Sequence, residues 1–359
     1  METFWIRPKL YFGPEPLEAL SALAGKRVLI VTDAFLASSG LLDRVKARLT
    51  GEVSVFDRVE PDPSLRLVAE GVKAVRTFRP EAVVAFGGGS PMDCAKAMCW
   101  FSGGRDLPLY CIPTTAGTGS EVTSFAVLTD TDRGVKYPLV EDGLLPRGAI
   151  LEPSFLDGVP PKVTADTGMD VLTHAAEAAA AVGANPFTDA LAESAFALAW
   201  RALPRAYQGD RAAKAEMLYA SCMAGVAFNA AGLGACHALA HALGGRFHLP
   251  HGRLNALLLP EVMACNAGDR WVVARYAALA KACGLAGTHR ALSAALVRLR
   301  TGLGLPNRLE VEPEALGAAL EDLTAAALAD RCMEQNPVRL GPEEVKALLV
   351  RAGGLGGRP

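Results

Sequence analysis

Short apolar runs rich in β-branched residues alternate with segments of helical spacing through residues 26–115. Apolar runs of this length, bounded by turn residues, are typical of strands that are buried on both faces of a sheet. Strands that alternate with helices favour a parallel sheet with helices on both sides. We therefore predict an α/β domain with strands at 26–33, 52–59, 81–90 and 107–115 and helices at 38–50, 64–78 and 91–101.

The segment after these elements has a different pattern. Two strand-like runs within 125–140 flank Asp132-Arg133-Gly134, which predicts an antiparallel hairpin added to the parallel sheet. A proline-rich stretch near residue 155 then marks a domain boundary. Beyond it, alanine and leucine recur at helical spacing with few strand signals. The sequence thus predicts an α/β domain over residues 1–154 and an all-α domain over residues 155–359.

Charge and composition exclude several classes of function. The 359 residues carry a formal net charge of −2, so the chain lacks the broad basic surface that binds nucleic acid or an anionic membrane. The N-terminus lacks the pattern of a secretory signal, and no uncharged apolar window is long enough to cross a bilayer. The eight cysteines form no C-x-x-C pair, which favours buried thiols in a reducing compartment. We expect a soluble cytoplasmic protein.

The segment GGGSPMDCAK at 87–96 follows an expected strand and opens an expected helix. In this position backbone amides can bind phosphate at the helix N-terminus, and glycine lets a ligand approach closely. Ser90 fits the N-cap, Pro91 the first helical position and Asp93 the third residue of a capping box. A tight turn that binds nothing is the alternative, although one glycine suffices for a turn. The loop is neither the six-residue G-x-G-x-x-G pattern nor a Walker A motif.

Polar side chains also follow two other expected strands. Asp33 ends the first strand, where an acidic group suits the ribose hydroxyls of NAD and repels the 2′-phosphate of NADP. An ordinary helix N-cap explains Asp33 equally well. The loop PTTAGTGSEVTS at 113–124 offers hydroxyl groups to a pyrophosphate or ribose, a weak signal by itself because such residues are common in loops. Since this loop follows the next strand, we expect it to face the same ligand as the glycine loop.

Four of the six histidines fall within the short stretch 231–255. They are His237, His241, His248 and His251. His237 and His241 are four residues apart, so they share one face of a helix, which Gly244 and Gly245 are expected to end. Any one of these histidines alone is more often a core or surface residue than a ligand. Their crowding in a chain so poor in histidine favours a metal site.

A second helix is expected to complete that site, because Asp170 and His174 are also four residues apart. The downstream cluster supplies the remaining nitrogens, with His237 and His251 preferred over the other two. Imidazole and carboxylate ligands together suit Zn²⁺ or Fe²⁺ better than Ca²⁺ or Mg²⁺. Glu177 shares the face of Asp170 and is either a partner of a ligand or an ordinary salt-bridged helix residue.

Taken together, GGGSPMDCAK, PTTAGTGSEVT, GMDVLTHAAEA and HALAHALGGRFHLPHGRLNALLLP resemble the motifs of the iron-containing (group III) alcohol dehydrogenases. The resemblance covers nearly the whole chain. It implies a dinucleotide-binding α/β domain, a helical domain and an active site in the cleft between them, an architecture similar to that of dehydroquinate synthase. It also implies a homodimer, metal ligation by Asp170, His174, His237 and His251, and a position for His241 near the nicotinamide. The residues that it places around NAD are Asp33, Gly87, Gly88, Gly89, Ser90, Asp93, Thr114, Thr115, Thr118 and Lys136.

The chain departs from the family pattern in three respects. Pro61-Asp62-Pro63 stands where the family usually has P-N-P, which puts an acidic group at an expected adenine contact and further disfavours NADP. Glu152-Pro153 replaces the usual D-P, a conservative change. The C-terminal half is somewhat short, so we expect part of the substrate-pocket wall to differ.

The resemblance implies that the chain interconverts a small, neutral primary alcohol and its aldehyde, with the substrate oxygen on Fe²⁺ or Zn²⁺ and hydride transfer to NAD. His241 is our candidate for the proton relay. One alternative is a dehydroquinate-synthase-like lyase, but such an enzyme needs Lys and Arg for a phosphorylated substrate, and residues 231–255 contain only Arg246 and Arg253. The other is a non-catalytic module that binds NAD and a metal with a closed coordination shell.

Overall fold

A computed structural model of the chain describes residues 4–103, 106–132 and 135–354. Internal contacts divide the chain into two compact units, Met1–Val159 and Pro160–Pro359. The division falls after residue 159 rather than after residue 154, where the sequence suggested it. The physical reason is Phe155, which packs edge-on against Phe86 in the core of the first unit, with ring centroids 4.9 Å apart.

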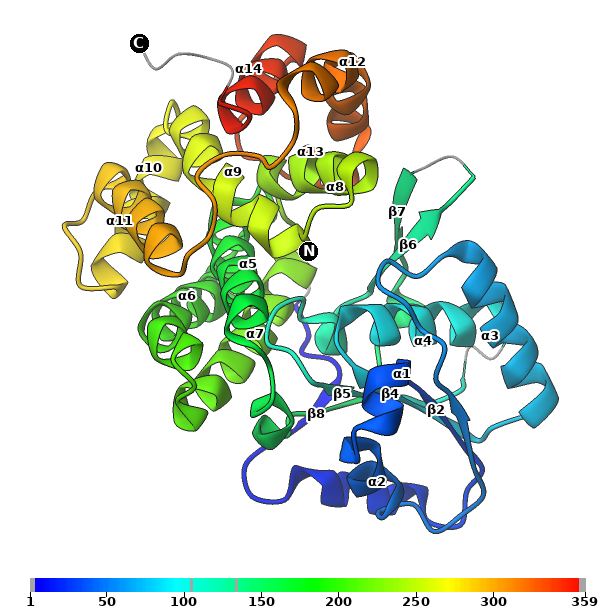
Figure 1. The fold of residues 1–359 in the computed structure, drawn as a ribbon. Helices are drawn as coiled ribbons and strands as arrows, with labels where there is room; N and C mark the ends of the chain where they lie inside the picture. The colour runs from blue at the N-terminus through cyan, green and yellow to red at the C-terminus, as the bar shows by residue number, and fades with distance from the viewer. Residues whose placement is uncertain (1–3, 104–105, 133–134, 355–359) are drawn as a thin grey trace. The chain divides into compact units, whose positions relative to one another are not determined.

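The first unit is built on a six-stranded parallel sheet, which confirms the predicted α/β class (Figure 1). Its strand order is β1-β8-β5-β4-β2-β3. The strands are β1 (Lys9–Tyr11), β2 (Val28–Val31), β3 (Val53–Phe56), β4 (Ala82–Gly87), β5 (Leu109–Pro113) and β8 (Gly148–Ile150). Strands β1 and β8 were not predicted from the sequence, because strands of three residues are too short to show a periodic pattern.

Alternate side chains of the central strands enter two separate hydrophobic clusters, one on each face of the sheet. In β2, Val28 and Ile30 belong to the cluster that contains residues of η1 (Pro16–Leu23), α1 (Ala34–Ser38) and α2 (Leu41–Lys46). Leu29 and Val31 belong to the cluster formed with α3 (Leu65–Phe78) and α4 (Gly89–Phe101). Burial on both faces explains why these strands are apolar throughout rather than alternating.

The order of the strands creates a preferred binding edge. The chain passes from β2 outward to β3 and then returns to β4, on the other side of β2. The carboxyl ends of β2 and β4 therefore flank a topological switch point, where open α/β sheets bind their ligands. Asp33 follows β2, Gly87 ends β4, and the loop that begins at Thr114 follows β5. All three predicted cofactor segments thus lie at one edge of the sheet.

The predicted hairpin is present, but it does not join the parallel sheet. Strands β6 (Phe125–Asp130) and β7 (Val135–Val140) pair antiparallel and form a sheet of their own. The expected turn residues Arg133 and Gly134 lie outside the described residues. The hairpin packs instead on α4, because buried polar groups of that helix bind the backbone of β6: Asp93 Oδ2 accepts from the Val127 amide at 2.9 Å, and Lys96 Nζ donates to the Phe125 carbonyl at 2.8 Å.

The second unit is helical in its described residues, as predicted. Its main helices are α5 (Pro161–Ala180), α6 (Pro186–Tyr207), α7 (Arg211–Ala231), α8 (Ala235–Phe247), α9 (His251–Asn266), α10 (Arg270–Ala282), α11 (His289–Gly302), α12 (Pro313–Ala329), α13 (Arg331–Glu334) and α14 (Pro342–Ala352). In the part of the chain that the structure describes, no single helix is long and apolar enough to cross a membrane. Only α7 and α8 together meet that length and composition, and they are bent by 103°.

The helix that carries His237 is longer than the sequence suggested. Gly244 and Gly245 were expected to end it, but α8 continues through both to Phe247. The left-handed residue that ends the helix is His248, with φ +54°, and its amide donates to the Gly244 carbonyl. Gly244 is buried inside the helix and does not reverse the chain.

Lys96 is a buried cation that holds the loop after β5 and the start of β6 against α4. Its Nζ donates to Ser120 Oγ at 2.9 Å and to the carbonyls of Thr123 and Phe125, both at 2.8 Å. Burial lowers the pKa of Lys96, and the neighbouring Asp93 opposes that shift. The hydrogen bonds to Nζ and the nearby Asp93 carboxyl offset part of the cost of burying this side chain.

We expect Lys96→Met to destabilise the first unit, since it strands several buried acceptors and leaves Asp93 without its cation. The free energy of unfolding should fall by about 3 kcal/mol. Urea denaturation followed by fluorescence measures it. The matched control is Lys73→Met on the exposed face of α3, which removes the same charge and should change stability by less than about 0.5 kcal/mol. Equal effects of the two substitutions would contradict the role given to Lys96.

Candidate metal centre and nucleotide loops

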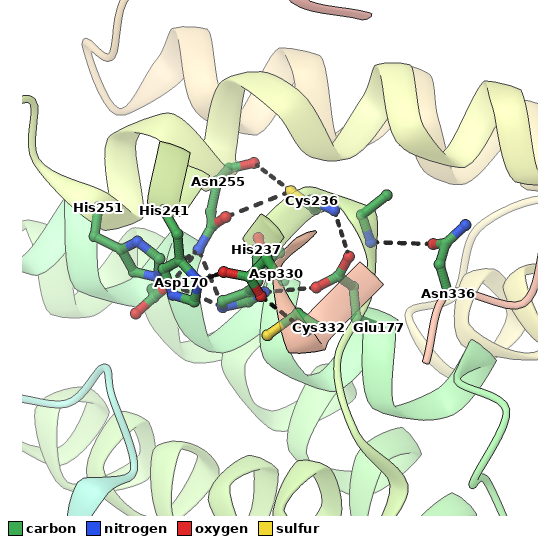
Figure 2. Close-up of polar contacts among 12 residues, drawn as sticks. Asp170, Glu177, Cys236, His237, His241, His251, Asn255, Asp330, Cys332 and Asn336 are labelled. Carbon is green, nitrogen blue, oxygen red and sulfur yellow. Dashed lines mark hydrogen bonds and ion pairs between the residues drawn. The ribbon is translucent and has the colours of Figure 1, made fainter. Parts of the chain in front are cut away.

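Three of the four predicted metal ligands converge in the second unit (Figure 2). Asp170 of α5, His237 of α8 and His251 of α9 each present one ligand atom, and these atoms lie within 4.8 Å of one another. Asp170 Oδ1 is 3.8 Å from Nε2 of His237 and 3.7 Å from Nε2 of His251. Bonds of about 2.0–2.2 Å to one cation place its ligand atoms roughly 3–4 Å apart. The spacing therefore suits a single metal ion.

Glycine and an ion pair bring α9 close enough to α5 for this convergence. A Cβ on Gly252 would overlap the carbonyl oxygen of Asp166, so only glycine permits this approach of the two helices. The next residue, Arg253, binds Asp166 with two hydrogen bonds of 3.2 and 3.1 Å. Because His251 is the first residue of α9, these contacts fix its position beside Asp170.

Glu177 determines which nitrogen of His237 faces the other ligands. Its Oε2 lies 2.5 Å from Nδ1 of His237, and its Oε1 accepts from the Cys236 amide at 2.7 Å. Burial lowers the pKa of His237 well below its usual value, with the neighbouring imidazoles adding to the shift, so the ring is neutral and carries one N–H. With that proton on Nδ1 toward Glu177, the lone pair of Nε2 points at Asp170.

Burial also raises the pKa of Glu177 to about 8, while the amides of Cys236, Gly234 and His237 limit the rise. The sequence left two roles open for Glu177. The contact with His237, with both side chains buried, favours the role of partner to a ligand over that of a solvated helix residue.

Asn255 lies at the point on which the three ligand atoms converge, and the sequence analysis missed it. Its Nδ2 is 2.7 Å from Asp170 Oδ1 and 3.1 Å from Nε2 of both His237 and His251 (Figure 2). An amide NH₂ group is a donor with two hydrogens, so it can donate to two of these atoms at a time. Two imidazole nitrogens and a carboxylate oxygen that converge in this way are a donor set that suits a divalent transition metal. The one available signal was spacing, since Asn255 follows His251 by four residues on α9.

The fourth predicted ligand, His174, does not belong to the convergent trio. Its buried ring is stacked against His237, with centroids 4.5 Å apart, and against Phe228, with centroids 4.4 Å apart. It nevertheless lies one helical turn after Asp170, beside the trio. His248, which competed for a ligand position, is exposed at the end of α8.

His241 lies next to the trio and is paired with Asp330, another residue that the sequence analysis missed. His241 Nδ1 is 2.9 Å from Asp330 Oδ2, and its ring is stacked on His251 with centroids 5.2 Å apart and planes at 13°. Burial raises the pKa of Asp330, but the hydrogen bond and charge of His241 and the Cys332 amide together hold it below its usual value. No spacing rule connects His241 to a residue so distant in the chain.

The glycine loop and the threonine loop of the first unit touch through their backbones and methyl groups. A Cβ on Gly88 would lie 3.1 Å from Thr115 Oγ1, and one on Gly89 would lie 2.8 Å from Thr118 Cγ2. A side chain at either position would crowd the threonine side chain opposite it. Glycine therefore leaves the first amides of α4 uncovered beside threonine hydroxyls, the donor set that binds a pyrophosphate.

The local roles of three predicted cofactor residues differ from the expectation. Helix α4 begins at Gly89 with Gly88 as its N-cap, so Ser90 and Asp93 form no capping box. Asp93 instead accepts from Ser120 Oγ at 2.6 Å and from the Val127 amide, and these bonds hold the threonine loop and β6. The earlier start arises because glycine N-caps a helix without needing a side-chain bond.

Two further predicted cofactor residues are engaged with the protein. Asp33 accepts from the Leu36 amide at 2.8 Å and caps α1, which is the structural alternative considered for it. Lys136, the other of these two residues, has its Nζ 2.6 Å from Asp62 Oδ1. Its positive charge therefore neutralises Asp62, the acidic residue by which Pro61-Asp62-Pro63 departs from the family pattern. Thr114, which follows β5, is buried and its amide donates to the Gly87 carbonyl at 3.0 Å.

Comparison with known proteins gives one consistent family. Residues 8–153 match the family described as iron-containing alcohol dehydrogenase, and residues 164–353 match the C-terminal part of the Fe-containing alcohol dehydrogenase family. The chain is 44% identical over 367 residues to the 1-propanol dehydrogenase PduQ of Salmonella typhimurium, covering 97% of this chain and 99% of that protein. It is 36% identical to the NADPH-dependent butanol dehydrogenase of Clostridium saccharobutylicum, covering 97% of both.

Solved structures agree with these relatives. The iron-containing alcohol dehydrogenase of Thermococcus thioreducens superposes with a TM-score of 0.91 at 34% identity, covering 98% of this chain and 99% of that one. Sulfoacetaldehyde reductase from Bifidobacterium kashiwanohense, in complex with NAD⁺, superposes with a TM-score of 0.88 at 28% identity, covering 99% and 100%.

Replacing Glu177 with glutamine is expected to weaken metal binding: the amide oxygen stays with the Cys236 amide, so an NH₂ donor faces Nδ1 of His237 and disfavours the tautomer with the proton on Nδ1. Loss of such a partner typically costs 10- to 100-fold in metal affinity, and we predict a dissociation constant raised by about that factor. Competition with a chromophoric chelator measures it. The control is Glu193→Gln on the exposed face of α6, which should leave the affinity unchanged. An unchanged affinity in Glu177→Gln would contradict the role of Glu177.

Proposed function

We propose, since the chain belongs to the iron-containing alcohol dehydrogenase family, that it interconverts a small, neutral primary alcohol and its aldehyde with NAD as the hydride carrier. The first unit is proposed to bind NAD and the second to bind the metal. The observation that carries the proposal is the convergence of ligand atoms from Asp170, His237 and His251 on one point.

The donor set fits the metal that the family implies. We assign Asp170, His174, His237 and His251 as the ligands of Fe²⁺, with Zn²⁺ as the other ion that these donors suit. When bound, the cation supplies Lewis-acid polarisation of the substrate oxygen and NAD supplies the hydride acceptor. His241 holds a proton on Nδ1 against Asp330, which leaves Nε2 as the atom that can take the substrate's hydroxyl proton.

The carboxyl edge of the sheet supports the proposal for NAD. The amides of the glycine loop and the hydroxyls of the threonine loop are proposed to bind the pyrophosphate, because the two loops pack closely against each other. These residues are Gly87, Gly88, Gly89, Ser90, Thr114, Thr115 and Thr118. Asp33 is proposed to bind the ribose hydroxyls beside β2. Asp93 acts by holding the threonine loop, and Lys136 contributes a cation next to Asp62.

A phosphorylated substrate, as in a dehydroquinate-synthase-like lyase, is not favoured. Arg253 is the arginine nearest to the trio in sequence, and it is bound by Asp166 and by Glu310, the latter at 3.0 Å. Its charge is therefore already neutralised by two carboxylates. Small alcohols need no such cation, since the metal supplies the charge that holds their oxygen.

The cellular compartment and the oligomeric state are also proposed for this chain. All eight cysteines are free thiols and most are buried, which suits the reducing cytoplasm. We propose a cytoplasmic homodimer on the resemblance, with no nucleic acid and no membrane among its partners.

Turnover after reconstitution with Fe²⁺ or Zn²⁺ tests the function. We expect NADH to accumulate with ethanol, propanol, butanol or a diol, whereas a lyase that cycles NAD internally accumulates none. His251→Ala should abolish metal binding and turnover while NAD still binds, because it removes one of three convergent donors. The control is His289→Ala, which changes an isolated histidine of α11 and should retain metal binding and turnover. Full activity in metal-free His251→Ala would refute the mechanism.

Asp33→Ser tests the choice between NAD and NADP. Serine is also a good N-cap, so the bond to the Leu36 amide can be kept while the negative charge is removed. Loss of a repulsion of about 1–4 kcal/mol should lower the KM for NADP by about fivefold or more, with a smaller change for NAD. Steady-state kinetics with each nucleotide measures this shift. An unchanged ratio of the two KM values would show that Asp33 is only a helix cap.

A further inference from the structure

The carboxylate of Asp330 fixes His241 next to the metal trio. Asp330 lies between α12 and α13 and its side chain is 8% exposed, while that of His241 is 13% exposed. The two oxygens of Asp330 have separate partners: Oδ1 accepts from the Cys332 amide at 2.8 Å, and Oδ2 lies 2.9 Å from His241 Nδ1. The Cys332 side chain also donates to this carboxylate, so it is held by several donors and has little freedom to rotate.

The imidazole is also held through its face. The ring of His241 is stacked on that of His251, with planes at 13°, and meets His237 edge-on with centroids 6.1 Å apart. A stacked ring can still flip by 180° about its Cβ–Cγ bond, which keeps its plane and exchanges its two nitrogens. Among the described residues, the bond to Asp330 is the hydrogen bond that opposes this flip. Stacking therefore sets the plane of the His241 ring, and the bond to Asp330 determines that Nε2 is the nitrogen that points away from the carboxylate.

An ionised carboxylate accepts hydrogen bonds and cannot donate them. The bond to Asp330 Oδ2 therefore requires the His241 proton to be on Nδ1, which leaves the lone pair on Nε2. Within the described residues, Nε2 of His241 has no protein hydrogen-bond partner, and the side chain keeps some exposure. This nitrogen is available to a bound molecule.

His241, Asp330 and Cys332 lie close enough to suggest a second metal site, with ligand atoms within 4.8 Å. Two observations disfavour it. Nδ1 of His241 is already a donor to Asp330, so it presents no lone pair to a cation. Burial raises the pKa of Cys332 well above its usual value, which keeps its thiol protonated and a poor ligand. The three residues are better explained as a hydrogen-bonded support for the imidazole.

We propose that Asp330 is a positioning residue that holds His241 in the tautomer with Nδ1 protonated and Nε2 open to the substrate. This role rests on the proposed alcohol dehydrogenase function. Oxidation of the alcohol removes a hydride, which NAD accepts, and a hydroxyl proton, which Nε2 of His241 accepts. The imidazolium so formed is stabilised by the Asp330 carboxylate until the proton leaves to solvent, and reduction of the aldehyde reverses each transfer.

Asp330→Asn keeps the size of the side chain but replaces the acceptor that faces Nδ1 of His241 with a donor. The Cys332 amide is a donor, so the amide oxygen of the new side chain stays with it and the NH₂ group faces His241. A donor at that place requires Nδ1 of His241 to accept, and the ring proton moves to Nε2. Nε2 can then no longer take a proton from the substrate.

The first readout is the tautomer itself, measured by ¹⁵N NMR of histidine-labelled, Zn²⁺-loaded protein. His241→Gln assigns the signals. We expect a protonated Nδ1 in the unchanged protein and a protonated Nε2 in Asp330→Asn. The second readout is kinetic: kcat should fall roughly 100-fold or more while KM changes only a few-fold, since general acid–base catalysis contributes about that much. Asp322→Asn on the exposed face of α12 is the matched control and should change neither readout.

Asp330→Glu keeps the carboxylate and should restore the Nδ1 tautomer and part of kcat, which a purely structural role does not predict. An unchanged tautomer in Asp330→Asn, or an altered tautomer with unchanged kcat, would overturn the proposal. If Asp330→Asn loses metal or unfolds, Asp330→Glu decides: restored metal without the Nδ1 tautomer also overturns it. An unchanged protein that shows the Nδ1 tautomer but turns over no alcohol would refute the proposed function and leave the orientation of His241 standing.

Discussion

The hydrogen bond between Glu177 and His237 determines how tightly the second unit can bind a metal. A neutral imidazole offers one lone pair, and the partner of one nitrogen determines the role of the other. With Nδ1 held by Glu177, Nε2 faces Asp170, and Nδ2 of Asn255 lies 2.7–3.1 Å from the candidate ligand atoms of Asp170, His237 and His251. If the ring were reversed, an N–H group would point at Asp170 and the donor set would lose one member.

The same principle operates at His241, where a carboxylate from a distant helix takes Nδ1 and leaves Nε2 open. In both cases the protein binds one nitrogen in order to present the other. The difference lies in the surroundings: His237 is buried among candidate ligands, whereas His241 keeps part of its side chain exposed. Burial suits a permanent bond to a metal, and partial exposure suits a proton that must come and go.

In the first unit, packing rather than polar bonding prepares the binding edge. Gly88 and Gly89 let the threonine loop approach the start of α4, while Lys96 and Asp93 hold that loop from behind. These buried charges stabilise a loop that would otherwise be free to move away from the helix N-terminus. The switch point between β2 and β4 then places Asp33 at the same edge.

Much of the fold could be predicted because its signals are local. The central strands are apolar runs, and the pair Asp170 and His174 shows helical spacing, so the α/β class and the helical second part were found correctly, as was the family. Contacts between residues that are distant in the chain produce no local sequence signal, so they could not be predicted. Asn255 and Asp330 act through hydrogen bonds to other helices, and the hairpin sits on α4 because Asp93 and Lys96 bind its backbone.

Other predictions were wrong because the same short sequence pattern is compatible with more than one local structure. Gly244 and Gly245 fit a helix end and also fit a helix interior, and the latter is what the structure has. The segment after Gly87 fits a capping box, but glycine can cap without a side chain, so α4 begins earlier. Burial and packing select among such local structures, and neither is visible in a short stretch of sequence.

Anomalous diffraction at the iron absorption edge, from crystals of the Fe²⁺-loaded protein, tests the metal centre most directly. We predict one peak per chain within about 2–2.5 Å of Asp170 Oδ1, His237 Nε2 and His251 Nε2. A peak at another place in the chain, or no peak at these three atoms in protein that holds one iron per chain in solution, would contradict it.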